Sequence, residues 1–190
     1  MNCADFYRLA PNRVWRTYLG GATLDAIYGK PAPADSHFPE DWILSTTRAV
    51  NAGRESVLEG VSKVVTESGE LLVTELLDRF PEEILGTAHL AKFGKQTGFL
   101  LKYLDSAIRL HLQCHPSIPF ARKHLHSECG KSEGYYILGV RPGCEGYIYL
   151  GFQNPPSPEE LRRMIAEQDI AALLSCFEKI PVRPGDAFYV

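Results

Sequence analysis

The residues best suited to chemistry lie in two short stretches near the middle of the chain. Residues 110–115 read Leu-His-Leu-Gln-Cys-His, which on a β-strand would place His111, Gln113 and His115 on one face. Glu133 follows 18 positions after His115, at the start of a second apolar stretch. Zinc and similar divalent metals accept imidazole nitrogen together with carboxylate or amide oxygen. On spacing alone, a metal site competes with a simpler interpretation, a strand whose histidines face solvent.

A second group of candidate ligands has a simpler explanation. His124, His126 and Glu128 alternate in the sequence and mimic a ligand triplet. Residues 121–125, however, are expected to form a short helix or loop, where alternate side chains diverge. We therefore interpret these three residues as part of a solvated surface.

The surrounding pattern predicts short strands in the second half of the chain. From residue 99 the hydrophobic period is two, and we expect strands at 99–104, 108–115, 134–140, 147–152, 178–181 and 186–190. Two helices are expected between them, at 157–167 and 171–177. The first has a strong start signal, because Ser157 can cap it, Pro158 suits the first position and a glutamate suits the third.

The first half of the chain is predicted to be irregular and then helical. Residues 1–50 contain many glycines and prolines but also large apolar side chains, so we expect them to wrap a core. Residues 69–94 have an apolar period near 3.6, with Ser68 as the cap and Gly94 at the end. This period predicts a helical stretch.

The order of these elements indicates a mainly β, antiparallel fold with helical inserts instead of a βαβ alternation. We expect an N-terminal wrapping and helical part at 1–98. A strand-rich part at 99–190 would carry a helical insert at 157–177. The two parts are expected to form one structural unit. A chain of 190 residues is long enough for one domain with a full hydrophobic core and short for two domains.

Composition argues against several classes of protein. The net charge of −3 gives no electrostatic signal for nucleic acid or an anionic membrane, and no apolar run approaches the roughly 20 residues that span a bilayer. The first residues lack the pattern of a signal peptide. The chain has five cysteines and no CxxC pair, which favours free thiols in a cytoplasmic protein over disulfides. They are Cys3, Cys114, Cys129, Cys144 and Cys176.

The candidate ligands lie within stretches that resemble known motifs. Gln113-x-His115 followed by Glu133 and Gly139 resembles the first cupin motif, and residues 184–189 resemble the opening of the second. More narrowly, the chain resembles type I phosphomannose isomerases over nearly its whole length. The segments that carry this resemblance are 100–105, 113–116, 130–133, Gly20-Gly21-x-x-Leu24, Trp42-Ile43-x-Ser45 and 159–161.

The resemblance implies a cupin-type antiparallel β-barrel (a jelly roll) with helical inserts, incomplete at its C-terminus. It also implies that Gln113, His115 and Glu133 hold zinc or another divalent metal. Lys131 matches a basic residue that lines the sugar-phosphate pocket. His111 stands where the family commonly has serine. Lys131 and His111 are therefore the two candidates for the catalytic base and for substrate contact.

The activity implied by the resemblance is metal-dependent isomerisation between mannose 6-phosphate and fructose 6-phosphate. The metal would stabilise an enediolate, and a base would carry the proton between C2 and C1. The alternative is a non-catalytic cupin that binds sugars or regulates, favoured by two family residues that this sequence lacks, a fourth histidine ligand and an arginine. The 190-residue chain by itself is expected to show little activity. The expected partner is a sugar phosphate, with neither nucleic acid nor membrane.

Overall fold

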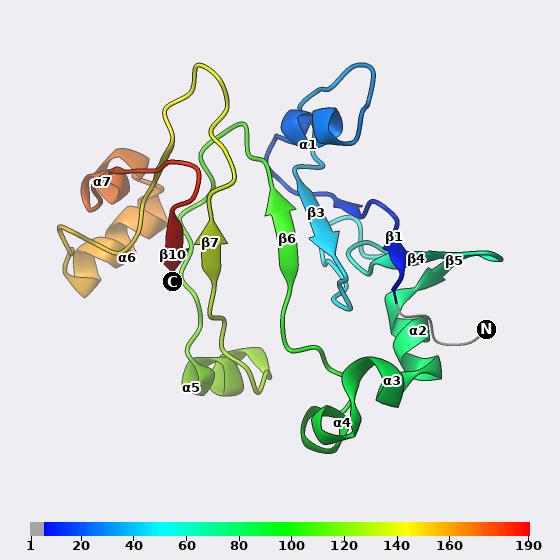
Figure 1. Cartoon of the computed structure of the whole chain (residues 1–190). Helices are drawn as coiled ribbons and strands as arrows, with labels where there is room; N and C mark the ends of the chain where they lie inside the picture. Colours follow the sequence, from blue (N-terminus) through cyan, green and yellow to red (C-terminus); the bar gives the residue numbers. More distant parts are fainter. Residues whose placement is uncertain (1–5) are drawn as a thin grey trace. The chain divides into compact units, whose positions relative to one another are not determined.

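The protein divides into two compact units, Met1–His111 and Leu112–Val190 (Figure 1). The structure is a computed structural model that describes residues 6–190, so Cys3 lies outside the described residues. The predicted boundary between the two parts lies at residue 98, where the hydrophobic period changes. In the structure the first strand after that change belongs to the first unit. That the two parts form one structural unit stays a prediction.

The first unit contains two three-stranded antiparallel sheets. Their orders are β1-β4-β5 and β2-β3-β6. The strands are β1 (Arg8–Leu9), β2 (Arg13–Val14), β3 (Glu40–Ile43), β4 (Lys63–Thr66), β5 (Gly69–Leu72) and β6 (Leu101–Leu104). Figure 1 shows β3 beside β6. Residues 1–50, expected to be irregular, thus supply three strands and helix α1 (Ala22–Ile27). Val14, Tyr18 and Trp42 of this segment are buried.

The glycine pair before α1 is required by the close approach of three chain segments. Gly20 forms β-bridges to both Ser36 and Ser106. A Cβ atom at Gly20 would lie 2.0 Å from the carbonyl oxygen of Asp105. Gly21 has a φ of +100°, a left-handed backbone conformation that side chains other than glycine rarely adopt.

The helical stretch predicted for residues 69–94 is wrong for its first residues. Residues 69–72 form β5, which turns back on β4 in a hairpin and pairs the buried Leu71 with the buried Val64. The local period permits a helix, but the neighbouring strand offers both a hydrogen-bond partner and an apolar contact. Ser68 is consequently a turn residue and not a cap. The helices that follow are α2 (Val73–Arg79), α3 (Pro81–Leu85) and α4 (Thr87–Phe93), the last ending at Gly94 as predicted.

The second unit contains two antiparallel strand pairs. They are β7 (Gly134–Tyr136) with β10 (Ala187–Tyr189), and β8 (Tyr147–Ile148) with β9 (Ile180–Pro181). Each lies inside a stretch predicted as a strand, although the observed strands are shorter. The prediction for residues 108–115 is wrong, because no strand includes them. A strand needs a hydrogen-bonded neighbour, and none of the described strands pairs with these residues.

The helices of the second unit agree well with the sequence. They are α5 (Ile118–Phe120), the π-helical turn η1 (Ala121–Leu125), α6 (Pro158–Glu167) and α7 (Ile170–Ser175). The amide of Glu160 donates to Ser157 Oγ over 3.2 Å, and the Glu160 carboxylate accepts from the amide of Ser157 over 2.9 Å. The predicted cap of α6 is therefore confirmed.

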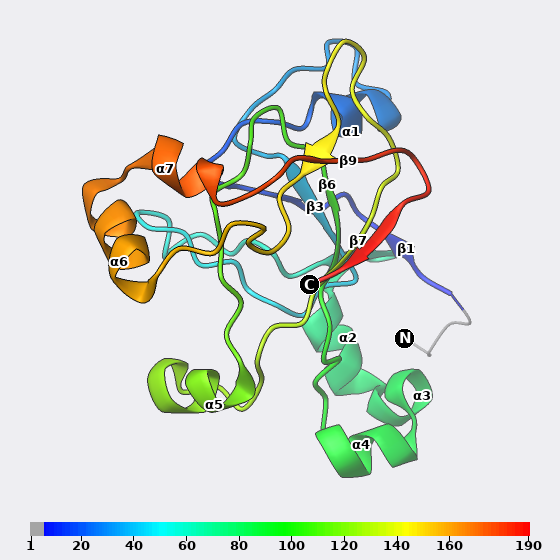
Figure 2. The same cartoon turned by 90° about the vertical axis from the view of Figure 1, so that its left-hand side faces the viewer.

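Helices α6 and α7 lie next to each other (Figure 2), and their side chains contribute to an apolar cluster of the second unit. Met164, Leu173 and Cys176 are its buried residues, and Leu112 packs against them. The antiparallel pairing and the helical insert are thus as expected. None of the helices within residues 6–190 is long and apolar enough to cross a membrane.

Candidate functional site

Three of the five candidate side chains contact one another in the second unit. His115 Nε2 lies 3.0 Å from Glu133 Oε2. Lys131 Nζ lies 3.2 Å from His115 Nε2 and 3.2 Å from Glu133 Oε2. An imidazole, a carboxylate and an ammonium group therefore meet at the corners of a nearly equal-sided triangle.

Backbone hydrogen bonds bring the two sequence stretches together. The amide of Lys131 donates to the carbonyl of Pro116 over 3.1 Å. Glu133 and Val190 exchange two backbone hydrogen bonds, of 2.7 and 3.2 Å, which extend the β7–β10 ladder by one residue pair. Leu112 anchors the segment before His115 to the core of α6 and α7. Glu133 is thus positioned by the β7–β10 pair and Lys131 by the hydrogen bond to Pro116. The segment that leads to His115 is positioned by Leu112.

Gly130 makes this arrangement possible, and the sequence analysis did not single it out. A Cβ atom at Gly130 would lie 2.7 Å from the Pro116 carbonyl oxygen and 3.0 Å from the Ile118 amide nitrogen. Real Cβ atoms essentially never approach closer than 3.0 Å. Its place directly before Lys131 was the only sequence signal of its role.

The three contacting side chains differ in their access to solvent. His115 and Glu133 are sheltered, with side-chain exposures of 16% and 15%, whereas Lys131 is 48% exposed. His115 Nδ1 is buried and has no hydrogen-bond partner within residues 6–190. Because no described neighbour fixes the tautomer of this ring, Nε2 can either donate to Glu133 or offer its lone pair to a cation.

Gln113 and His111 do not take part in the contact. Both side chains are exposed. The alternation that was expected to aim them at one point requires a strand, and the segment is not a strand. His111 closes the first unit and Gln113 lies in the second.

The site contains two groups of the kinds that bind divalent cations. His115 and Glu133 offer one imidazole nitrogen and one carboxylate, and the Lys131 ammonium already stands in hydrogen-bond reach of both as a cation. Within the described part of the chain, no cluster of three or more His, Cys, Asp or Glu side chains could hold a metal. His115 and Glu133 could supply at most two ligands, and a metal would need a third, such as an amide oxygen.

The alternating triplet after α5 is not a ligand set. His124 lies in η1, where its ring packs against Phe120 with centroids 4.6 Å apart. Glu128 pairs with Arg122 over 2.8 Å. His124, His126 and Glu128 are all exposed, in agreement with the predicted solvated surface.

The cysteines within residues 6–190 are all free thiols. Cys114, Cys129 and Cys144 are exposed, and Cys176 is buried in the core of the second unit. The prediction of free thiols is confirmed for these four.

A buried acidic group lies in the first unit, on β3. The Glu40 carboxylate accepts hydrogen bonds from the Tyr18 hydroxyl, from Trp42 Nε1 over 2.7 Å and from Lys102 Nζ over 3.3 Å. Burial alone would raise the pKa of Glu40, but Lys102 and the hydrogen-bond donors outweigh burial and hold this pKa below its ordinary value. Burial beside this carboxylate also raises the pKa of Tyr18.

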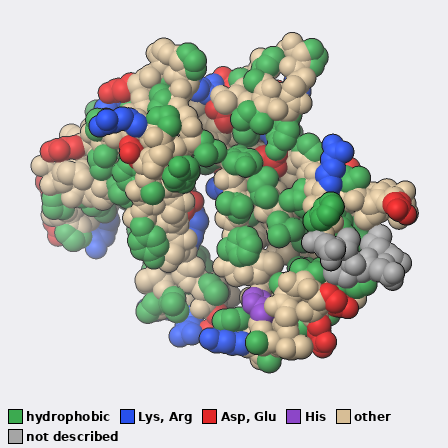
Figure 3. Space-filling view, viewed as in Figure 1, with side chains coloured by type: hydrophobic (Ala, Val, Ile, Leu, Met, Phe, Trp, Pro, Cys, Tyr) green, Lys and Arg blue, Asp and Glu red, His purple; other side chains and the backbone are tan. Residues whose placement is uncertain are grey.

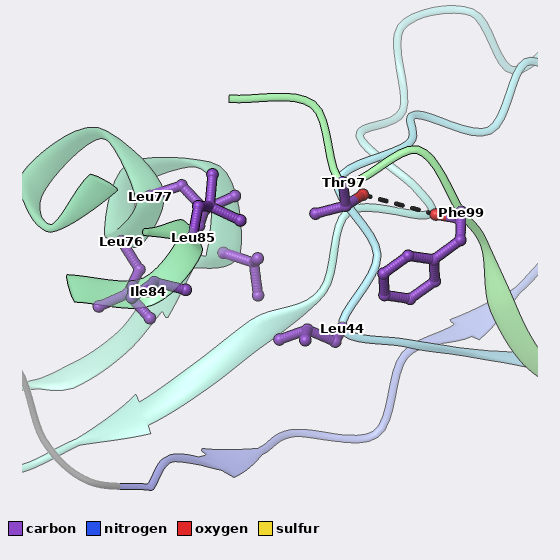
Figure 4. A pocket seen from close by; sticks show the side chains of 8 residues that line it. Leu44, Leu76, Leu77, Ile84, Leu85, Thr97 and Phe99 are labelled. Carbon is purple, nitrogen blue, oxygen red and sulfur yellow. Dashed lines mark hydrogen bonds between the residues drawn. The ribbon is translucent and has the colours of Figure 1, made fainter. Parts of the chain in front are cut away.

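The first unit also contains an apolar pocket of about 220 Å³ (Figure 4). It is lined by Leu44, Val73, Leu76, Leu77, Ile84, Leu85, Thr97 and Phe99. Thr97 carries the only polar side chain of this lining, and its hydroxyl lies 3.5 Å from the Phe99 carbonyl. The lining therefore offers no group for acid–base or metal chemistry.

Comparisons with curated proteins find a relative that matches almost the whole of this chain. The chain is 32% identical over 181 residues to a curated protein named mannose-6-phosphate isomerase from Streptococcus mutans serotype c. That match covers 94% of this chain and 48% of the relative, so the chain spans about half the length of this relative. No protein-family model matches the chain.

Two solved structures share the fold. A protein from Archaeoglobus fulgidus, provisionally assigned as a mannosephosphate isomerase, matches with a TM-score of 0.70 and 23% identity over 97% of this chain and 54% of its own. The mannose 6-phosphate isomerase of Bacillus subtilis matches with a TM-score of 0.62 and 25% identity, over 96% of this chain and 51% of its own.

Proposed function

We propose that this chain, a relative of the mannose-6-phosphate isomerases, forms the part of such an enzyme that binds a divalent metal and a sugar phosphate. The reaction is the interconversion of mannose 6-phosphate and fructose 6-phosphate. The observation that carries the proposal is the contact among His115, Lys131 and Glu133, three positions that the family resemblance assigns to the metal and the sugar phosphate.

The corresponding fold would be a cupin-type antiparallel β-barrel with helical inserts. Antiparallel pairing throughout the described strands and the likeness to the two solved structures support it. So do large side chains that face solvent on the β7–β10 pair, Tyr136 at 65% and Tyr189 at 78% exposure. Apolar side chains are widely exposed (Figure 3). Further strands of a barrel would cover such faces.

His115 Nε2 and Glu133 Oε2 would be two ligands of the metal, with the amide oxygen of Gln113 as the third. Zinc suits this set of nitrogen and oxygen donors, as do other borderline divalent metals. When bound, the metal would polarise the substrate oxygen next to C2 and stabilise the negative charge that develops there.

The protein's own groups would move the proton and hold the phosphate. A base must take the proton from C2 and return it at C1. Lys131 and His111 are the candidates for this base. Lys131, half exposed beside the two ligands, can alternatively hold the phosphate through its ammonium group. His115 and Glu133 are sheltered, which strengthens electrostatic interactions among the groups of the site.

The cytoplasm is the compartment that we propose for this protein. Its four described cysteines are unpaired, as thiols are in a reducing compartment. The proposed partner is the sugar phosphate.

The test is a coupled assay of fructose 6-phosphate formation from mannose 6-phosphate with added zinc. Because the chain spans about half of its Streptococcus mutans relative, the assay uses both the 190-residue chain and a chimera that continues with the unmatched part of that relative. We expect the chimera to be active and the chain alone to show little activity.

A glutamate pair gives the matched control for the chimera. Glu133→Gln should lower kcat/KM by about 100-fold, because it replaces the charged carboxylate ligand with a neutral and weaker one. Glu128→Gln removes the same charge from an exposed side chain. It should leave kcat/KM within about twofold of the unsubstituted chimera. A folded, zinc-loaded chimera without isomerase activity, or equal kinetics for the two variants, would contradict the proposed function.

A further inference from the structure

The apolar pocket of the first unit has a buried floor and an exposed rim (Figure 4). Its floor includes Leu76 and Leu77 of α2, which are 3% and 4% exposed and belong to an apolar core cluster. Its rim is formed by three exposed side chains, those of Leu44, Ile84 and Phe99. A molecule that enters at the rim would therefore contact core side chains at the floor.

The size and the lining of the pocket restrict what it can bind. None of the eight described side chains that line it is charged, so a charged group would lose its hydration there without gaining a partner. An apolar cavity of about 150 Å³ binds benzene, whereas pockets for drug-sized molecules begin at about 300 Å³. A volume of about 220 Å³ therefore fits one uncharged ring with a short substituent.

Two side chains favour an aromatic ring that carries a hydroxyl group. The Phe99 ring at the rim can pack against a second ring, and such pairs are more stable than their buried area alone predicts. The Thr97 hydroxyl has only long contacts, 3.3 Å to the Thr46 hydroxyl and 3.5 Å to the Phe99 carbonyl oxygen. It can therefore turn toward a polar atom of a ligand.

The backbone of Leu44 is strained at the rim. Its φ of +49° lies in the left-handed region, which a bulky side chain rarely adopts. The next residue holds this turn in place, because Ser45 donates its amide to Ser62 Oγ and accepts the amide of Ser62 at its carbonyl, both over 2.8 Å. Strain of this kind is found at ligand sites, where the surrounding structure maintains it. Here it accompanies an apolar side chain that lines the pocket and is exposed to solvent.

We propose that this pocket binds a small uncharged aromatic molecule, of the size of one benzene ring with a short hydroxyl-bearing substituent. All of its lining residues belong to the first unit, whereas His115, Lys131 and Glu133 belong to the second. The inference therefore does not depend on the proposed isomerase function. Binding to the folded chain would also stabilise the first unit against unfolding.

The first test uses benzyl alcohol as the probe and benzoate as its charged counterpart. The 190-residue chain is labelled at its leucine and valine methyl groups and titrated under observation by NMR. Benzyl alcohol should shift the methyl signals of Leu76 and Leu77 in a saturable way, with a Kd of about 1 mM or lower, as is usual for a ligand of this size. Benzoate should bind at least about tenfold more weakly, because its charge would be buried unpaired.

A pair of exposed isoleucines on helices gives the matched control. Ile84→Phe puts a ring at the rim, where it competes for the space of the pocket, and should weaken benzyl alcohol binding at least about fivefold. Ile165→Phe makes the same change on α6 of the second unit and should leave the affinity within about twofold. Leu44→Gly is a second variant that retains the fold, because glycine adopts a positive φ without strain. Loss of the Leu44 side chain should also weaken binding, by about threefold or more.

The hydroxyl contact has its own test. Thr97→Val should weaken benzyl alcohol binding about fivefold and leave the binding of toluene, which has no hydroxyl, unchanged. Equal affinity of Thr97→Val and the parent for benzyl alcohol would overturn the hydroxyl as part of the ligand.

Three outcomes would overturn the site itself. They are benzoate binding as tight as that of benzyl alcohol, unchanged affinity in both Ile84→Phe and Leu44→Gly, and no saturable shift at Leu76 or Leu77. An affinity that falls as the protein concentration rises would show that a second copy of the chain occupies the pocket instead.

Discussion

The backbone amide of Lys131 donates a hydrogen bond to the carbonyl oxygen of Pro116 over 3.1 Å. The donor lies two residues before Glu133 and the acceptor directly follows His115. One hydrogen bond between the two segments therefore brings the imidazole within 3.0 Å of the carboxylate.

Lys131→Ala should lower the activity of the chimera far more than Lys123→Ala. The first change removes the ammonium group beside the two ligand candidates, whereas the second removes one from the exposed turn η1. A general base or a phosphate contact contributes at least about 100-fold in rate or affinity. Steady-state kinetics with mannose 6-phosphate measure the effect. Equal kinetics for the two variants would show that Lys131 is an ordinary surface residue.

Gly130→Ala should move the segment that carries His115 away from the segment that carries Lys131 and Glu133. Its new Cβ would lie 2.7 Å from the Pro116 carbonyl oxygen, so the backbone must shift. Overpacking of this kind costs about 1–3 kcal/mol of unfolding free energy, and zinc affinity should fall with it. Gly139→Ala is the matched control, because no atom lies within 4 Å of its Cβ position. Denaturant unfolding and zinc calorimetry measure the difference, and a neutral Gly130→Ala would contradict the role assigned to this glycine.

Glu40→Gln should destabilise the first unit at neutral pH by about 3 kcal/mol, as expected when one partner of a buried ion pair is removed. The pKa of Glu40 in the folded chain lies below its ordinary value, so its stabilising effect is present above that ordinary value, near 4.3. The effect is lost as the pH falls through the folded pKa. The difference between parent and variant should therefore shrink in acid.

Tryptophan fluorescence is the readout for this pH dependence, since both tryptophans, Trp15 and Trp42, lie in the first unit. Urea unfolding at pH 7 and at about pH 3 gives the two free energies. Glu70→Gln is the control, because Glu70 pairs with Lys63 on the surface and should contribute less than about 1 kcal/mol. If Glu40→Gln lowers the free energy of unfolding equally at both pH values, the stabilisation does not depend on the ionisation of Glu40.

Ser157→Ala should cost about 1 kcal/mol in the second unit, because Ser157 Oγ accepts the amide of Glu160 at the start of α6. Ser175→Ala removes a hydroxyl that bonds only to a carbonyl within its own helix, and should change stability by less than about 0.5 kcal/mol. Far-UV circular dichroism during denaturant unfolding measures both. If the two variants are equally stable, the capping hydrogen bond contributes nothing to α6.

Features that depend on neighbours along the chain could be predicted from the sequence. The cap and first turn of α6 follow from Ser157 and the three residues after it, and the end of α4 follows from Gly94. The resemblance to the phosphomannose isomerases likewise selects His115, Lys131 and Glu133, whose side chains contact one another in the structure. Residue type and order are sufficient to predict a helix cap or a helix end, because the hydrogen bonds involved join residues close together in the chain.

Features that depend on distant partners were decided only by the tertiary structure. Residues 69–72 became a strand because Leu71 meets Val64 on β4. Residues 108–115, although they alternate like a strand, found no partner and left His111 and Gln113 outside the contact. The position of Lys131 between His115 and Glu133 depends on the hydrogen bond to Pro116 and on the pairing of Glu133 with Val190. Sequence spacing gives the chemical groups, but contacts between segments far apart in the chain decide which of those groups meet.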